Sequence, residues 1–408
     1  MKKQNEIPKL RFPSFKNDWE IINGDIVFES VSNKNHNSDL PILAITQEQG
    51  AIPRDLIAYN ISVTDKSIES YKVVEEGDFI ISLRSFQGGI EYSNFKGICS
   101  PAYIILKPIK EIDRTFFKYY FKTPRYIKRL TKNLEGIRDG KMISFKYFSE
   151  AKLTFPTIPE QTRIASFFIV IDQKLFQLKQ KKTLLEQYKK GVMQKIFSQE
   201  LRFKDENGKE FPKWERKKLG EIGEFQTSSV DKLNVEGEKE VYLFNYMNVY
   251  RHENINKQTI TNLQVTTAKD TQIKSNNLVK GDILFTPSSE TPSDIGHSVV
   301  IFEDLENCVY SYHLMRFRPK IKIDILYSHY FCNIPDVLNQ FSKLSTGSTR
   351  FTISVKSFKS IEINLSCLKE QTKIANFLSV IDEKINHCQK QIEQTKQWEK
   401  GLLQKMFC

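Results

Sequence analysis

The chain has 408 residues and a formal net charge of +12, from 61 Lys and Arg against 49 Asp and Glu. Hydrophobic residues make up 39% of it and charged residues 27%. This composition excludes a disordered chain, a collagen-like chain and a polytopic membrane protein. The length predicts two to three domains, and the positive charge suggests a polyanionic partner without specifying a fold.

Three further features predict a cytoplasmic location. No run approaches the 18 or so apolar residues that a membrane span requires, and the first residues, MKKQNEIPKLRFP, lack the apolar core of a secretory signal. The six cysteines are scattered and form no CxxC pair. We therefore expect reduced thiols rather than a disulfide framework or a zinc site.

The first half is predicted to be a mixed α/β domain. Residues 73–85 form an apolar run around a Gly-Asp turn, and residues 102–108 form another, which indicates two strands. Asp113 is a good N-cap for a helix of about ten residues that stops before Pro124.

A long amphipathic helix is predicted to follow over residues 160–197. Its apolar residues fall three or four apart, with Lys, Gln and Glu between them. Thr157 and Glu160 have the spacing of a capping box at its start. At 1.5 Å per residue the helix is roughly 57 Å long.

The second half repeats this plan. Residues 370–407 match 160–197 without a gap at an offset of 210, with 16 of the 38 positions identical. The strand-like runs recur at residues 278–289 and 314–319. The N-cap of the short helix recurs as Asp324, and the proline before which that helix stops recurs as Pro335. Two shorter motifs also recur. These are Leu10-Arg11-Phe12 with Leu201-Arg202-Phe203, and Trp19-Glu20 with Trp214-Glu215.

The repeat predicts an α+β (mixed α/β) chain of two similar globular domains and an antiparallel pair of long helices. The motif Leu201-Arg202-Phe203 follows the first helix, whereas its twin lies at the opposite end of the chain. If the halves are equivalent, the second helix must return to the first domain, which makes the organisation circular. The predicted parts are 1–157, 158–199, 200–367 and 368–408, namely domain one, helix one, domain two and helix two.

Motifs of catalysis and metal binding are absent from the sequence. It contains no dinucleotide-binding fingerprint, Walker A loop, HExxH or GxSxG, and its six His show no ligand spacing. Asp382 and Lys384 resemble a piece of a nuclease motif, but they lie on the repeated helix. We therefore expect no catalytic residue and no metal site.

One candidate DNA-binding region lies before each long helix. Residues 114–146 contain ten Lys or Arg against two acids. The glycine-bounded segment 136–141 within them corresponds to residues 345–350 of the second half. Such loops let backbone approach phosphates and offer side-chain donors to bases. The alternative is a solvated helix face with plain surface loops. The candidate contacts are Arg138, Lys141, Lys146, Ser348, Thr349 and Arg350.

A second candidate region follows the Gly-Asp strand of each half, in residues 84–89 and 286–291. An arginine and a glutamine at 84 and 87 have donors suited to guanine and adenine edges respectively. A structural turn is the alternative. The segments differ between the halves, as two readers of different sequences would. The candidate contacts are Arg84, Ser85, Gln87, Ser288, Ser289 and Thr291.

Two variable domains, each trailed by an EQ-x-x-IA-x-F-x-x-x-ID-x-K helix, resemble the specificity (S) subunit of type I restriction–modification enzymes. The match covers essentially the whole chain. The resemblance rests mainly on residues Glu160-Gln161 to Lys174 and Glu370-Gln371 to Lys384. The chain lacks the Pro common in that family just before the second EQ, where Leu368-Lys369 stands.

The resemblance implies a non-catalytic subunit whose two halves read a bipartite site in double-stranded DNA. It implies two modification subunits, which methylate adenine with S-adenosylmethionine, and two restriction subunits, which use ATP and Mg. No cofactor is then expected on this chain. The helices would set the spacing of the half-sites and dock the modification subunits, with Phe168, Tyr188, Phe377 and Trp398 as candidate docking residues.

Two other functions stay open. One is a coiled-coil scaffold that binds only proteins. The other is the DNA-binding part of a fused or standalone methyltransferase system. Steep salt dependence of DNA binding would argue against the scaffold, because phosphate contacts release counterions.

Overall fold

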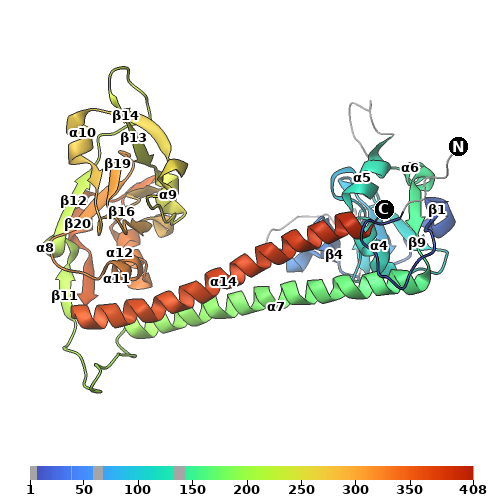
Figure 1. The fold of residues 1–408 in the computed structure, drawn as a ribbon, viewed down its shortest axis with the longest axis horizontal. Helices are drawn as coiled ribbons and strands as arrows, with labels where there is room; N and C mark the ends of the chain where they lie inside the picture. The colour runs from blue at the N-terminus through green and yellow to red at the C-terminus, as the bar shows by residue number, and fades with distance from the viewer. Residues whose placement is uncertain (1–6, 38, 58–67, 133–142, 408) are drawn as a thin grey trace. The chain divides into compact units, whose positions relative to one another are not determined.

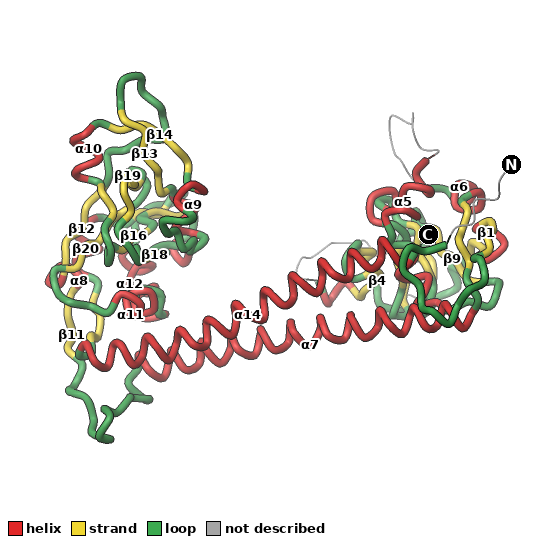
Figure 2. Tube along the Cα trace, viewed as in Figure 1, coloured by secondary structure: helices red, strands yellow, loops and turns green. Residues whose placement is uncertain are grey.

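The computed structural model describes residues 7–37, 39–57, 68–132 and 143–407. The chain divides into two compact units, drawn in Figures 1 and 2. Unit 1 comprises Met1–Gln180 and Gln389–Cys408, and unit 2 comprises Lys181–Cys388. Each unit therefore contains one globular half, part of the first long helix and part of the second.

Unit 1 is built on a four-stranded antiparallel sheet in the order β2-β9-β6-β7. The strands of this sheet are β2 (Phe28–Val31), β9 (Ile104–Pro108), β6 (Phe79–Ile81) and β7 (Glu91–Tyr92). Among the described residues of this unit, three two-stranded sheets accompany it: β1 (Glu20–Asn23) with β10 (Lys152–Phe155), β3 (Leu43–Thr46) with β4 (Gly50–Pro53), and β5 (Lys72–Val74) with β8 (Gly97–Cys99). The short helices are α1 (Gly24–Val27), η1 (Arg54–Leu56), α3 (Ser85–Gly88), α4 (Arg114–Tyr120), α5 (Pro124–Thr131) and α6 (Phe145–Glu150).

Unit 2 repeats this frame with a four-stranded antiparallel sheet in the order β12-β20-β16-β18. Its strands are β12 (Gly223–Thr227), β20 (Met315–Pro319), β16 (Ile283–Phe285) and β18 (Ser298–Val300). The pair β11 (Glu215–Lys218) and β22 (Glu362–Leu365) corresponds to β1 and β10. The helices of the common frame are α8 (Leu219–Ile222), α11 (Ile325–Phe331), α12 (Pro335–Leu344) and α13 (Val355–Ser360).

The second half also has a sheet of its own. This sheet is mixed, because β13 runs parallel to β19 whereas the other pairs are antiparallel. Its strands, in order, are β14 (Gln264–Ala268), β13 (Lys239–Phe244), β19 (Leu305–Tyr310) and β15 (Asn277–Leu278). The remaining elements are α9 (Tyr246–Tyr250), η3 (Ile260–Asn262), α10 (Asp270–Ser275), η4 (Pro292–Asp294), β17 (Ser288–Ser289) and β21 (Phe351–Thr352). The halves thus share a frame and differ in what is added to it.

The predicted strands and N-caps occur in both halves. Asp113 accepts a hydrogen bond from the amide of Phe116, and Asp324 accepts one from the amide of Tyr327. The helices that they cap end at Tyr120 and Phe331, a few residues earlier than expected.

Two long helices dominate the chain, α7 (Ile158–Phe197) and α14 (Leu368–Met406). In unit 1 the start of α7 packs against the end of α14, where the rings of Phe168 and Phe407 lie 5.7 Å apart between centroids. In unit 2 the end of α7 packs against the start of α14, and Ile196 shares a core with Ile374. The two helices are therefore antiparallel within each unit, as predicted.

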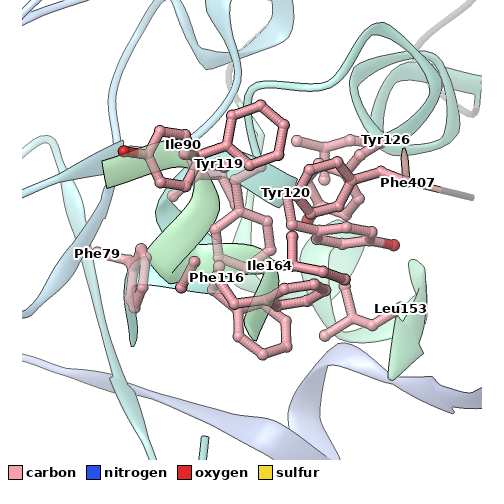
Figure 3. Packing of buried hydrophobic residues seen from close by; sticks show 14 of the residues in the cluster. Phe79, Ile90, Phe116, Tyr119, Tyr120, Tyr126, Leu153, Ile164 and Phe407 are labelled. Atoms are coloured by element: carbon pink, nitrogen blue, oxygen red, sulfur yellow. The ribbon is translucent and has the colours of Figure 1, made fainter. Parts of the chain in front are cut away.

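The end of the chain completes the core of unit 1. Phe407 packs against Phe116 of α4 at 5.2 Å and against Tyr120 at 6.1 Å between ring centroids, as Figure 3 shows. Ile164 of α7 belongs to the same buried cluster. The second helix thus returns to the first globular half, as the circular plan requires.

A buried glutamate ties each Leu-Arg-Phe motif to the start of a long helix. Glu160 is 1% exposed and accepts hydrogen bonds from Nε and Nη2 of Arg11 at 2.7 and 2.8 Å. Glu370 is fully buried and accepts the same two bonds from Arg202 at 3.2 and 2.7 Å. Removing one partner of a buried pair costs about 3–5 kcal/mol, because the other charge stays buried. The Glu160 carboxylate therefore binds Arg11, and the capping box with Thr157 stays a prediction.

Each Leu-Arg-Phe motif also binds the end of the other long helix, through a backbone hydrogen bond of its leucine. The amide of Leu10 donates to the carbonyl of Lys405 at 2.8 Å, and the amide of Leu201 donates to the carbonyl of Lys195 at 2.9 Å. The second bond is local in sequence, whereas the first brings the two ends of the chain together. Each motif therefore holds the start of one long helix and the end of the other within its unit.

The glutamine of the EQ motif connects each long helix to its globular half. Gln161 accepts from the amide of Asp113 at 2.9 Å and donates to the carbonyl of Pro156 at 2.8 Å. Gln371 makes the equivalent bonds to Asp324 and Ser366, at 2.9 and 2.7 Å. The side chain of each glutamine thereby spans the strand before the helix and the N-cap of α4 or α11.

One polar contact between the long helices differs between the units. In unit 2, Lys189 donates to the carboxylate of Asp382 at 2.6 Å. The residues at the same positions of unit 1 are Glu399 and Asp172, two carboxylates. Burial raises the pKa of Glu399, and the charge of Asp172 raises it further.

Replacing Glu399 with Gln should therefore stabilise the protein at pH 7.5. A carboxyl whose pKa is raised on folding binds more protons in the folded state, so stability falls as pH rises through that interval. The Glu399→Gln variant should resist denaturant better than the parent at pH 7.5, and the difference should shrink toward pH 4.5. Glu393→Gln, at an exposed position of the same helix, is the matched control. A destabilised Glu399→Gln variant at pH 7.5 would contradict the assignment.

Candidate functional site

In the second half the two candidate DNA-binding segments lie together. Strand β17 pairs with β21, which places Ser288 opposite Thr352 and Ser289 opposite Phe351. The guanidinium of Arg350 donates to the hydroxyl of Ser288 at 3.1 Å. Segments 286–291 and 345–352, about 60 residues apart in sequence, therefore form one surface.

The exposure of these residues separates two roles. Ser288 and Ser289 are 8% and 7% exposed, so their side chains mainly hold the two segments together rather than face a ligand. Thr291, Ser348, Thr349 and Arg350 are exposed. DNA contact by this surface is therefore a prediction for the exposed residues, and burial argues against direct reading by Ser288 and Ser289.

In the first half, segment 84–89 folds as the short helix α3. Arg84 and Gln87 are accessible, but Ser85 is buried, and its hydroxyl accepts a hydrogen bond from the amide of Ser82 at 2.8 Å. Ser85 therefore shapes the turn, and its position offers no direct contact with a base. Lys146 is exposed on α6. Arg138 and Lys141 lie outside the described residues.

The helix α3 lies against α5. Gly89 ends α3 with φ +80°, and a Cβ built there would come within 2.1 Å of the carbonyl oxygen of Phe121. Only glycine suits both the conformation and the close approach. The Nζ of Lys122 also donates to the carbonyl of Gly88 at 3.1 Å. The predicted reading segment of the first half is thus fixed beside a basic helix.

In the second half, α9 contributes an aromatic cluster that the sequence patterns did not indicate. The hydroxyl of Tyr246 donates to the carbonyl of Ser288 at 3.0 Å. The rings of Tyr246 and Tyr250 stack at 5.9 Å, and the hydroxyl of Tyr250 donates to the carboxylate of Asp294 at 3.1 Å. Helix α9 therefore supports both ends of the loop between β16 and β18.

Two histidines belong to the same aromatic cluster. Nδ1 of His252 lies 3.0 Å from the carbonyl oxygen of Ser298, and its Nε2 lies 3.3 Å from Nδ1 of His297. Nε2 of His297 lies 2.8 Å from the carboxylate of Asp294. Carbonyl and carboxylate oxygens only accept, so the ring nitrogens that face Ser298 and Asp294 are the donors. The two histidines are 45 residues apart, so no local motif could have revealed them.

The outer faces of the long helices present aromatic side chains. Tyr188 and Trp398 occupy equivalent positions of the repeat, and each is 54% exposed. Phe377 is half-buried against Phe203, whereas Phe168 is fully buried in the core of unit 1. Burial therefore leaves Phe168 unable to contact a partner, and the docking prediction depends on the exposed residues.

No helix in the described part of the chain combines the length and apolar character needed to cross a membrane. Within residues 7–37, 39–57, 68–132 and 143–407, no three His, Cys, Asp or Glu side chains form a group that could hold a metal ion.

Comparison with known proteins agrees with the duplicated fold. The family model of the type I restriction modification DNA specificity domain matches residues 19–187 and again residues 212–396. These two matches cover most of the chain, and each includes a globular half and most of the helix that follows it. The chain belongs to the family of type I restriction–modification DNA specificity proteins.

Two relatives support the same assignment. The chain is 27% identical to the type I restriction enzyme MjaVIII specificity subunit of Methanocaldococcus jannaschii, over 98% of this chain and 93% of that one. The putative MjaX specificity subunit of the same organism is 27% identical over 46% of this chain and 44% of its own length.

Two solved structures share the fold at 16% sequence identity. One is a chain of a type I R-M system studied for its complex assembly and conformational transition, with a TM-score of 0.61 over 97% of this chain and 98% of that one. The other is the S subunit of a type I restriction–modification system from M. genitalium, with a TM-score of 0.52 over 99% of both chains.

Proposed function

We propose that this chain is the non-catalytic subunit of a type I restriction–modification complex that reads DNA, and that each half recognises one part of a bipartite site. The repeated sheet with different loops on each copy carries this proposal. One frame gives both halves the same way to approach DNA, and different loops let them recognise different bases. Both halves also place accessible polar residues on the segments expected to contact bases, such as Gln87 and Thr349.

The partners follow from the family. We expect two modification subunits that methylate adenine with S-adenosylmethionine, and two restriction subunits that use ATP and Mg. In this assignment the chain itself binds no cofactor and performs no chemistry. Its contribution to the reaction is to choose the DNA sequence that the other subunits modify or cut.

The long helices are proposed to set the distance between the two half-sites. Helix α7 has 40 residues, which corresponds to about 60 Å at 1.5 Å per residue. After overlap with a globular domain at each end, this length suits half-sites about one duplex turn apart, ~34–36 Å. The buried contacts of Glu160 and Glu370 support a rigid spacer, because they fix where each helix begins.

Lengthening both helices by one heptad should lengthen the DNA spacer. Seven residues would be inserted after Gln180, near residue 182 of α7, and seven after Cys388 in α14. The insertion adds about 10 Å per helix and nearly preserves the helix face, so the gap should grow by about three base pairs. Methylated adenines would be mapped by single-molecule sequencing in cells that also contain the modification subunit. An unchanged spacing in an active complex would rule out the spacer role.

The exposed aromatic faces of α7 and α14 are proposed to dock the modification subunits. Tyr188 and Trp398 support this role, since Trp and Tyr are enriched among the residues that carry most of the binding energy of protein interfaces. Phe377 lies closer to the core and would contribute less.

The double variant Tyr188→Glu with Trp398→Glu should lose the modification subunit in co-purification. The matched control is Gln187→Glu with Gln397→Glu, which introduces the same charges one residue earlier at exposed positions. The control complex should survive, and thermal unfolding would verify that both variants remain folded. An undiminished complex with the chain changed at Tyr188 and Trp398 would contradict docking on these faces.

A further inference from the structure

Helices α5 and α12 occupy equivalent places in the two halves. Each begins with a proline, Pro124 or Pro335, directly after the capped helix α4 or α11. Over residues 124–132 and 335–343, the order of exposed, half-buried and buried side chains is identical at all nine positions. Tyr126 and Val337 are buried at the same position of the two helices. The same face of each helix therefore points outward in its own unit.

The charge on that face is not the same. Four polar positions of α5 and its C-cap hold cations, namely Arg125, Lys128, Arg129 and Lys132. The matching positions of the second half hold Asp336, Asn339, Gln340 and Lys343. The formal charges at the four positions therefore sum to +4 in the first half and to 0 in the second.

The neighbouring strand extends this difference. Lys152 begins β10 in the first half, and Glu362 begins β22 at the same place in the second half. The backbone of Glu362 exchanges two hydrogen bonds with the side-chain amide of Gln340, at 2.8 and 2.9 Å, so this strand end lies against α12. Asp336 and Glu362 line one cavity of about 440 Å³ beside α12 together with Arg216, whose guanidinium pairs with the carboxylate of Glu362. The glutamate is therefore balanced by its own partner, and the contrast between the halves comes from Lys152 and the four helix positions.

Two cations of the neighbouring helix α4 and its C-terminal turn have acidic partners. Lys122 lies 2.5 Å from the buried carboxylate of Glu91, and Lys118 lies 3.6 Å from the carboxylate of Asp172. Those lysines stabilise the fold, whereas Lys128 and Lys132 of the α5 segment extend into solvent. Positive charge is therefore concentrated on the outer face of α5, and α3, which carries the candidate reading residues, lies against this helix.

We infer that the outer face of α5 is a DNA phosphate-binding surface, and that the first half supplies most of the electrostatic attraction for DNA while the second half reads its half-site with little phosphate contact by α12. This inference rests on the proposed function. Phosphate contacts hold a protein in register but carry no sequence information. Loss of the α5 cations should therefore weaken binding to all sequences and leave the recognised site unchanged.

The test uses the full chain in complex with its modification subunit, and a duplex that contains the methylated site. Three variants are compared with the parent. The α5 variant, Lys128→Asn with Lys132→Gln, neutralises two exposed cations. The α12 neutral variant, Lys343→Gln, neutralises the exposed cation at the end of α12. The α12 basic variant, Asn339→Lys, gives α12 the charge that α5 has at that position. All four side chains are exposed, so the folds should persist.

The readout is the slope of log affinity against log salt concentration. Each phosphate contact adds about 0.9 to the steepness of this slope. The α5 variant should therefore show a slope shallower by up to about 1.8, and the methylated sequence should not change. The α12 neutral variant should stay close to the parent, and the α12 basic variant should have a slope steeper by up to about 0.9.

The outcomes separate the inference from the proposed function. An unchanged slope for the α5 variant, or an equal loss for the α12 neutral variant, would overturn the unequal division of phosphate contacts. A change in the methylated sequence with the α5 variant would instead assign α5 to base reading and overturn the phosphate role. If the parent complex shows no salt-dependent DNA binding, the proposed function itself fails.

Discussion

The buried pairing of a glutamate with an arginine is the constraint on which the rest of the structure depends. Glu160 and Glu370 lie at the first turns of the long helices and are almost fully buried. A carboxylate in such a place is stable only with a well-placed partner. Arg11 and Arg202 supply it, and in doing so they fix the Leu-Arg-Phe motifs at the helix starts. For Arg11 the consequence is global, because the amide of the neighbouring Leu10 binds the last turn of α14.

Because these buried contacts hold the frame of each unit together, the loops on it can vary. The four-stranded sheet, the capped helices and the EQ contacts are the same in both units, whereas the segments after β6 and β16 differ completely. One is the short helix α3, and the other is a loop held by β21 and α9. The charges on α5 and α12 differ on the same principle. Selection can therefore change what each half binds without disturbing the packing that defines where it lies within its unit.

The features that could be predicted from the sequence are those that residues close together in the chain determine. The gapless repeat at an offset of 210, the apolar spacing of the long helices and the N-caps Asp113 and Asp324 are each set by neighbouring residues. The antiparallel packing followed from connectivity, because twin motifs at opposite ends of the repeat must meet equivalent partners.

Other features depend on contacts across long sequence separations, so no local pattern contains them. Ser85, Ser288, Ser289 and Phe168 looked available in the sequence, but the segments that fold over them bury all four. The bond between His252 and His297 joins two loops. The contrast between α5 and α12 depends on which positions the folded helices expose, and the sequence alone does not give those positions.

A chain with one half duplicated would show whether two equivalent units each read their own half-site. Residues 20–155 would replace residues 215–365, so that β1 to β10 substitutes for β11 to β22 on the same long helices. Adenine methylation would then be mapped in cells that contain this chain and the modification subunit. Methylation should then occur at an inverted repeat of the half-site read by the first half. Persistent methylation at the original asymmetric site would contradict it.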